Sequence, residues 1–165
     1  MRNQTLGQRL GFIGQRIVWG LFAAGVPFGT MGQAACTIPV TVIGSQDTVT
    51  LSAEVMQTAE ARAMGLMYRT ELAPDHGMLF LYPTPRAAAF WMKNTYISLD
   101  IMFFDRSKQL LANFRETTPE DVTPLFGGDN VLFVLETLHG LEQRFALGEV
   151  EKISFDEGLA RECGA

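Results

Sequence analysis

Polar and apolar residues alternate without a break over residues 48–55, and this pattern constrains the fold more than any other feature of the chain. The apolar positions are Val49, Leu51, Ala53 and Val55. Successive side chains of a β-strand point to opposite faces of a sheet, so the pattern predicts a half-buried strand. Residues 38–43 precede it across a turn at residues 44–47, which predicts an antiparallel hairpin.

Short apolar or β-branched segments recur along the rest of the chain between turn residues. We expect further strands at residues 78–82, 87–93, 97–104, 109–114, 131–136 and 151–155. Pro83 and Pro85 are expected to end the first of these. Asn94 and Thr95 are expected to form the turn that joins the second and third into a hairpin. Residues 115–128 contain two prolines and two glycines and read as a loop.

Two segments have helical character. Thr58 can cap a helix that we expect to run to about residue 69, with Glu60 in its first turn. A second short helix is expected at residues 141–147, where Gly148 stops it. Strands joined by short turns, together with two short helices, predict a single α+β domain with a curved, mainly antiparallel, barrel-like sheet.

The N-terminus has the three parts of a secretory signal peptide. Residues 1–16 contain three arginines and no acidic residue, and residues 17–26 are apolar or small. Small residues at the −3 and −1 positions predict cleavage after Ala34. We therefore expect a signal peptide at residues 1–34, a domain at residues 35–165, and a periplasmic or secreted location. An uncleaved interfacial helix is the alternative.

Removal of the signal peptide would leave a strongly acidic domain. The whole chain has 13 Lys and Arg against 18 Asp and Glu. Three arginines leave with the signal peptide, so 10 basic and 18 acidic residues remain, a net charge of −8. Nucleic acids and anionic membrane surfaces need a basic face, so both are disfavoured as partners. No later segment is long and apolar enough to span a bilayer.

Two cysteines, Cys36 and Cys163, lie near opposite ends of the expected domain. An even number of cysteines in an oxidising compartment suggests a disulfide, while two free thiols at frayed ends are the alternative. Lipidation of Cys36 is disfavoured, because Gln33 stands where a lipobox has an aliphatic residue. The sequence has no CxxC motif, so thiol redox chemistry is unsupported.

Several sequence blocks occur in an order typical of one family. They are RAMGLMYR at residues 62–69, GMLF at 77–80, FWMKNT at 90–95, LDIMF at 99–103 and VLE at 134–136, with Gly140 downstream. In these blocks the chain resembles the family called domain of unknown function 192, over about residues 40–155. The resemblance implies a compact α+β fold, often behind an export signal, and no established activity. Residues 115–128 resemble the family least.

The first block offers a pair of arginines. Arg62 and Arg69 are seven residues apart and would project from one side of the expected helix, with Gly65 leaving bare backbone between them. Two guanidinium groups suit a carboxylate or a phosphate. Alternatively, at least one arginine pairs with an internal carboxylate, for which Asp100 and Glu136 are the candidates.

The FWMKNT block offers an aromatic wall with a charged rim. Trp91 and Lys93 share one face of the expected strand, and Asn94 begins the turn. Asp100 is expected to face Lys93 across the hairpin. The alternative is an ordinary cross-strand ion pair, with Trp91 packed under a helix.

Motifs for the commoner catalytic chemistries do not occur in the sequence. His76 and His139 lack metal-ligand spacing, so we expect no metal and no cofactor. Methionines together with His76 could hold Cu(I), but methionine among apolar residues is usually core. We find no nucleophile elbow, P-loop or dinucleotide motif.

Three functional hypotheses follow. The first, which we favour, is an exported module that binds a small polar or anionic molecule through Arg62, Gly65, Arg69, Trp91, Lys93, Asn94, Asp100 and Glu136. The second is an envelope hydrolase or lyase, with Asp100 or Glu136 as acid–base group and Arg62 or Lys93 stabilising negative charge. The third is a cell-envelope interaction domain that docks a partner on an exposed apolar patch.

Overall fold

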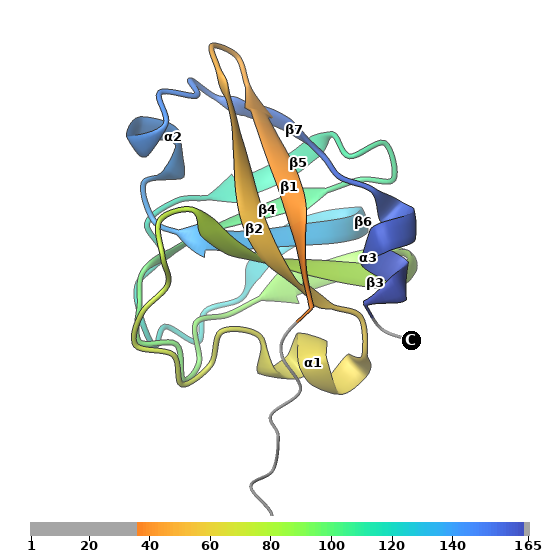
Figure 1. Cartoon of the computed structure of the whole chain (residues 1–165). Coiled ribbons are helices and arrows are strands. Elements are labelled where there is room, and N and C mark those ends of the chain that lie inside the picture. The colour runs from red at the N-terminus through yellow and green to blue at the C-terminus, as the bar shows by residue number, and fades with distance from the viewer. Residues whose placement is uncertain (1–35, 164–165) are drawn as a thin grey trace, which may run out of the picture. The chain divides into compact units, whose positions relative to one another are not determined.

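The computed structural model describes residues 36–163, in which seven strands form one sheet in the order β5-β4-β6-β3-β2-β1-β7. The strands are β1 (Thr37–Gly44), β2 (Thr48–Met56), β3 (His76–Phe90), β4 (Leu99–Phe104), β5 (Leu110–Phe114), β6 (Leu125–Leu138) and β7 (Val150–Ser154). The helices are α1 (Ala59–Met64), α2 (Leu141–Arg144) and α3 (Glu157–Glu162). Every neighbouring strand pair is antiparallel except β2 with β3. The predicted single α+β domain with a curved, mainly antiparallel sheet is confirmed (Figure 1).

The two edge strands, β5 and β7, approach each other and nearly close the sheet into a barrel. Gln109 and Lys152 form an isolated antiparallel bridge between the chain segments that carry these strands. The N–H of Ile153 donates to the carbonyl of Lys108 over 3.0 Å. Closure of this kind protects strand edges that would otherwise expose unpaired backbone groups.

The predicted hairpin is confirmed, since β1 pairs with β2 and Val40 lies opposite Leu51. The expectation that Pro83 and Pro85 end a strand is wrong. Residues 76–90 form one strand instead of two, because Pro83 and Pro85 fall where the register with β6 shifts between Leu81 and Arg86. At such an interruption the missing proline N–H removes no ladder hydrogen bond.

The expected hairpin between residues 87–93 and 97–104 is also wrong. β4 pairs with β5 and β6 instead, and residues 91–98 connect β3 to β4 without strand structure. Strand β6 begins at Leu125, so it takes in the end of the expected loop.

The helices also differ from expectation. Thr58 caps α1 as expected, because its Oγ1 accepts a hydrogen bond from the N–H of Ala61 over 3.0 Å. However, α1 ends at Met64, since Gly65 has a φ of 47° and leaves the helical conformation. Helix α2 is shorter than expected, and α3 was not predicted, so there are three helices in the described residues.

Two apolar clusters share the sheet. One contains Phe133 and Leu135 of β6 and packs beneath β1, β2 and β7. The other contains Phe80, Phe103 and Val134, with Leu66 from the segment after α1. Edge-to-face pairs run through this second cluster: the ring centroids lie 5.0 Å apart for Phe80 and Phe90 and 5.4 Å apart for Phe90 and Phe103. Such pairs favour a fixed relative orientation of the rings.

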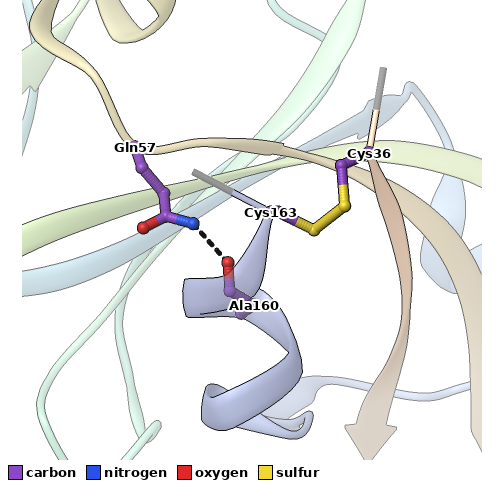
Figure 2. Close-up of a disulfide and its surroundings, with 4 residues drawn as sticks. All are labelled: Cys36, Gln57, Ala160 and Cys163. Atoms are coloured by element: carbon purple, nitrogen blue, oxygen red, sulfur yellow. Dashed lines mark hydrogen bonds between the residues drawn. A yellow bond between two sulfur atoms is a disulfide. The ribbon is translucent and has the colours of Figure 1, made fainter. Parts of the chain in front are cut away.

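A disulfide joins Cys36 to Cys163, with 5.4 Å between the two Cα atoms. It ties the start of β1 to the end of α3, as Figure 2 shows. The side chain of Gln57 donates a hydrogen bond to the carbonyl of Ala160 and gives α3 a second tether.

The expected signal peptide, and with it the expected cleavage after Ala34, lies outside the described residues. No helix in residues 36–163 is long and apolar enough to cross a membrane.

Candidate functional site

A pocket of about 230 Å³ opens between α1, the segment that follows α1, strand β3 and the chain around residue 91. Most of its lining residues have apolar side chains, but polar atoms make up more of its exposed surface than apolar atoms do. It includes Arg62, Met64, Gly65, Met67, Phe80, Tyr82, Phe90, Trp91, Thr95 and Glu136. Small-molecule sites in proteins commonly have this composition.

Glu136 is the acidic residue of this lining. It lies on β6, opposite Met78 of β3 and Ile101 of β4, and is only 5% exposed. Its Oε2 atom has no hydrogen-bond partner among residues 36–163. Burial among apolar side chains penalises the charged form and raises the pKa of Glu136 to about 8. At neutral pH the side chain is therefore mainly a neutral acid, which can both donate and accept a hydrogen bond.

Gly65 leaves the pocket open above this carboxyl group. A Cβ atom at position 65 would lie 3.2 Å from Cζ of Phe80 and 3.8 Å from Oε2 of Glu136. Any larger side chain at position 65 would reach further into the space beside the carboxyl group. The positive φ of Gly65 and the space beside Glu136 both favour glycine here.

Exposed aromatic and sulfur-containing side chains occur in the pocket lining and next to it in the sequence. Trp91 is 50% exposed and Met64 is 54% exposed, and both line the pocket. Tyr68 and Tyr96 are exposed as well, and their ring centroids are 6.5 Å apart. Large exposed apolar side chains that gather in one place usually mark a binding surface.

Arg62 is held in place by backbone groups and an aromatic ring. Its Nη1 donates to the carbonyl of Leu81 over 3.0 Å and also to the carbonyl of Gln57. Its guanidinium carbon lies 5.1 Å from the ring centroid of Tyr82. Burial raises the pKa of Tyr82, although the positive charges of Arg86 and Arg62 act to lower it. Among the described residues, Arg62 makes no ion pair.

Arg69 lies beyond the end of α1 and does not line the pocket. Its Nη1 and Nη2 each bind one carboxylate oxygen of Glu54, both over 2.6 Å. This hydrogen-bonded pairing raises the pKa of Arg69. The expectation that an internal carboxylate pairs with one of the two arginines is confirmed. The expected partners, Asp100 of β4 and Glu136 of β6, are wrong, because the acid is Glu54 of β2.

Asp100 also lies outside the lining of the pocket. It is 3% exposed, and its Oδ1 and Oδ2 accept hydrogen bonds from the N–H groups of Glu116 and Leu141, each over 2.9 Å. The carboxylate thus joins the loop after β5 to the start of α2. The expected pairing of Asp100 with Lys93 is wrong, since the hairpin that would bring them together does not form.

Lys93 and Asn94 are placed beside the pocket and not in it. Lys93 is exposed, and its Nζ lies 5.7 Å from the ring centroid of Trp91. Asn94 has a φ of 55°, and its carbonyl accepts from the N–H of Tyr68 over 2.7 Å. Its Nδ2 also donates to the hydroxyl of Tyr68 over 2.9 Å. Asn94 therefore fastens the segment after β3 to the segment after α1.

The pocket thus brings together four of the eight residues named from the sequence: Arg62, Gly65, Trp91 and Glu136. Sequence reasoning missed Phe80, Tyr82, Phe90 and Thr95. Phe80 and Phe90 belong to the GMLF and FWMKNT blocks, but their pattern is that of ordinary core residues. Within residues 36–163, no group of three or more His, Cys, Asp or Glu side chains is arranged to hold a metal ion.

Comparison with known proteins assigns the chain to a family. The family model of DUF192, described as Uncharacterized ACR, matches residues 41–155. The chain belongs to the DUF192 family. The pocket-forming segments of this DUF192 protein, from α1 to β6, all lie within the matched residues. No curated protein matches the chain significantly.

Two solved structures resemble this DUF192 protein. One is a protein of unknown function from Novosphingobium aromaticivorans DSM 12444, with 37% identity and a TM-score of 0.67. The match covers 72% of this chain and 84% of that chain. The other comes from Sinorhizobium meliloti 1021 and is described as a "putative transcription regulator", with 30% identity and a TM-score of 0.68. That match covers 72% of this chain and 93% of the other. Both solved structures share the fold of this DUF192 protein.

Proposed function

We propose that this chain is an exported module that binds a small molecule in the pocket above Glu136. The observation that carries the proposal is the buried Oε2 atom of Glu136, which has no partner among the described residues and belongs to a side chain that lines the pocket. Buried polar groups are nearly always hydrogen-bonded, so an unpaired one at a pocket calls for a ligand group.

The chemistry of the pocket indicates what kind of molecule would fit. Phe90 and Trp91 provide apolar surface for the body of a ligand. Glu136 in its neutral form would exchange hydrogen bonds with one hydroxyl, carbonyl or amide group. The volume of about 230 Å³ is below that of typical drug-sized sites, so the ligand is small. We therefore propose a small neutral molecule that has both an apolar part and a polar group.

This ligand class differs from the anionic one suggested by a pair of arginines. Arg69 is neutralised by Glu54, and Lys93 lies outside the pocket. Arg62 is the cation that remains in the lining. An anion in this pocket would also be penalised by burial, as the charged form of Glu136 is.

Export is supported by two features of the chain. The N-terminal sequence has the pattern of a signal peptide. The disulfide between Cys36 and Cys163 is a bond that persists in the periplasm and outside the cell but is rare in the cytoplasm.

A binding screen with matched variants tests the proposal. The purified protein is screened by ligand-detected NMR against small neutral compounds that carry one polar group, such as benzyl alcohol and benzamide. We expect binding that Glu136→Leu and Trp91→Ala abolish, that Glu136→Gln largely retains, and that the exposed control Glu71→Gln leaves unchanged. Binding that survives in Glu136→Leu would refute the role of the carboxyl group.

Acid–base catalysis in the same pocket is the second candidate, and the pKa of Glu136 favours it. A group with a pKa of about 8 can donate and accept protons near neutral pH, as a general acid or base must. Glu136 is the better choice than Asp100, whose two oxygens are both occupied by backbone N–H groups. Glu136→Gln separates the candidates, because it keeps the hydrogen bonds of a binding site and removes the proton transfer that a hydrolase or lyase would need.

A further inference from the structure

A second cleft lies on the other side of Arg62 and Tyr82, which line both cavities. It has a volume of about 280 Å³ and is bordered by α3, β3, β6 and the turn after β4. Its apolar surface comes from Leu81, Pro83 and Phe133, among others. Nothing in the proposed function uses this cleft.

Positive charge dominates the second cleft. Three arginines line it, Arg62, Arg106 and Arg161, against the single acid Glu157. Glu157 is already paired twice, with Nζ of Lys108 at 3.2 Å and with Arg161 at 3.6 Å. Arg62 and Arg106 make no ion pair among residues 36–163.

This concentration of charge is unusual for the chain. Residues 36–163 carry 10 basic and 18 acidic side chains, so three of the ten basic ones meet in one small cleft. Positive charges that line one cleft repel one another, and a bound anion would offset that repulsion. Arg62 is fixed through Nη1 to backbone carbonyls, and a guanidinium group has further N–H donors for a ligand.

We propose that this second cleft binds a small oxyanion, a carboxylate or a phosphate, held by Arg62, Arg106 and Arg161. Guanidinium forks match the geometry of both groups. The apolar surface of Leu81 and Phe133 would contact any hydrocarbon part attached to the anion. Glu136 does not line this cleft, although Arg62 and Tyr82 line both cavities.

The wall that carries Arg161 is α3, and two tethers hold α3 in addition to the ion pair of Lys108 with Glu157. These are the Cys36–Cys163 disulfide and the hydrogen bond from Gln57, whose side chain also lines the cleft (Figure 2). The position of Arg161 therefore depends on an intact disulfide. Reduction of that bond is expected to weaken anion binding.

Titration of the full purified protein with sodium phosphate, and separately with sodium acetate, tests the site. Ionic strength is held constant with chloride, and backbone amide shifts are followed by NMR. We expect saturable binding of at least one anion, with shifts centred on α3 and Arg106. In Arg106→Gln/Arg161→Gln the affinity is expected to fall about tenfold or more, since two charged hydrogen-bond donors are lost. Comparison of the two titrations shows which oxyanion is preferred.

Lys93→Gln/Lys152→Gln is the matched control, because it removes the same amount of positive charge from exposed residues outside the cleft. We expect this double variant to keep its affinity within about twofold. Absence of saturable binding in the wild-type protein, or an equal loss in both double variants, would overturn the proposal. Glu136→Leu is expected to bind the anion normally, so the two clefts are tested separately.

Discussion

Gly65 lies directly above Glu136, so that a Cβ atom at position 65 would be 3.8 Å from the Oε2 atom of the buried acid. The two residues are 71 positions apart in the sequence and meet because α1 ends where the pocket begins. The glycine leaves space beside the buried carboxyl group, and the apolar cluster around it keeps the group neutral at pH 7. Their combination makes this pocket a candidate binding site.

The buried acid makes stability depend on pH. Burial raises the pKa of Glu136 from 4.5 to about 8, so the folded protein holds this proton more tightly than the unfolded chain does. The stabilisation that comes from this bound proton is fully present below pH 4.5 and is lost as the pH rises toward 8. We expect Glu136 to lower the free energy of unfolding by at most about 5 kcal/mol across this interval.

Urea denaturation between pH 5 and pH 8.5 measures this effect. The variant Glu136→Gln cannot titrate, so its stability is expected to fall much less than that of the wild type. Glu71→Gln, an exposed control, should retain the wild-type slope. Parallel curves for wild type and Glu136→Gln would show that Glu136 has no raised pKa.

Gly65→Ala is expected to harm both the fold and the pocket. Gly65 combines a φ of 47° with a ψ of −134°, a conformation that residues with a side chain rarely adopt, so the strain should cost about 1–3 kcal/mol. The new methyl group would also contact Phe80 and narrow the access to Glu136. Thermal denaturation and the ligand screen measure the two effects.

Gly140→Ala provides the comparison, because Gly140 also has a positive φ, 76°, but lies away from the pocket. A Cβ atom there meets no atom closer than 3.7 Å. This variant is expected to lose about 1 kcal/mol of stability and to bind ligand normally. Equal ligand binding by both variants would contradict the role assigned to Gly65.

The pair formed by Arg69 and Glu54 is expected to stabilise the fold without affecting the pocket. Both contacts are 2.6 Å long, and the Glu54 side chain is only 15% exposed. A double-mutant cycle with Arg69→Ala and Glu54→Ala is expected to give a coupling energy of about 1–2 kcal/mol. The exposed pair of Arg161 and Glu157 should give about 0.5 kcal/mol or less. Loss of ligand binding in Arg69→Ala, with the fold intact, would show that this residue belongs to the site.

The disulfide is expected to contribute strongly to stability, because it closes almost the whole domain. Cys36 and Cys163 are 127 positions apart, and a loop of this length corresponds to about 4–5 kcal/mol in the chain-entropy model. Denaturation with and without a reducing agent measures the loss, and hydrogen exchange is expected to rise first in α3. A Cys36→Ser/Cys163→Ser variant should be insensitive to the reducing agent. An unchanged unfolding midpoint on reduction would contradict this account.

Local patterns predicted much of the fold, and long-range pairing explains most of what they missed. The hairpin of β1 and β2 follows from alternation and a short turn, and both are local. The length of α1 was overestimated because the residues after Gly65 have helical character, while the backbone at this glycine leaves the helix. The continuous β3 was missed because prolines usually end a strand, and only the register shift opposite β6 accommodates them.

The candidate site was also predictable only in part, because it depends on contacts between segments far apart in the sequence. Glu136 was predicted as an internal carboxylate that could pair with an arginine, and Gly65 as a glycine between two arginines. The partner of Arg69 depends on the parallel pairing of β2 with β3, which no short motif indicates. Phe80 and Phe90 look like any core residue, so their place at the pocket becomes visible only in the structure.

The most direct test of the central claim is an NMR titration of the Glu136 carboxyl carbon in protein labelled with ¹³C-glutamate. The signal is assigned by its absence from Glu136→Gln. We predict a midpoint near pH 8, as expected for a buried acid without a partner beside an open pocket. A midpoint near 4.5 would mean that the carboxylate is solvated or paired, and it would contradict the proposed binding site.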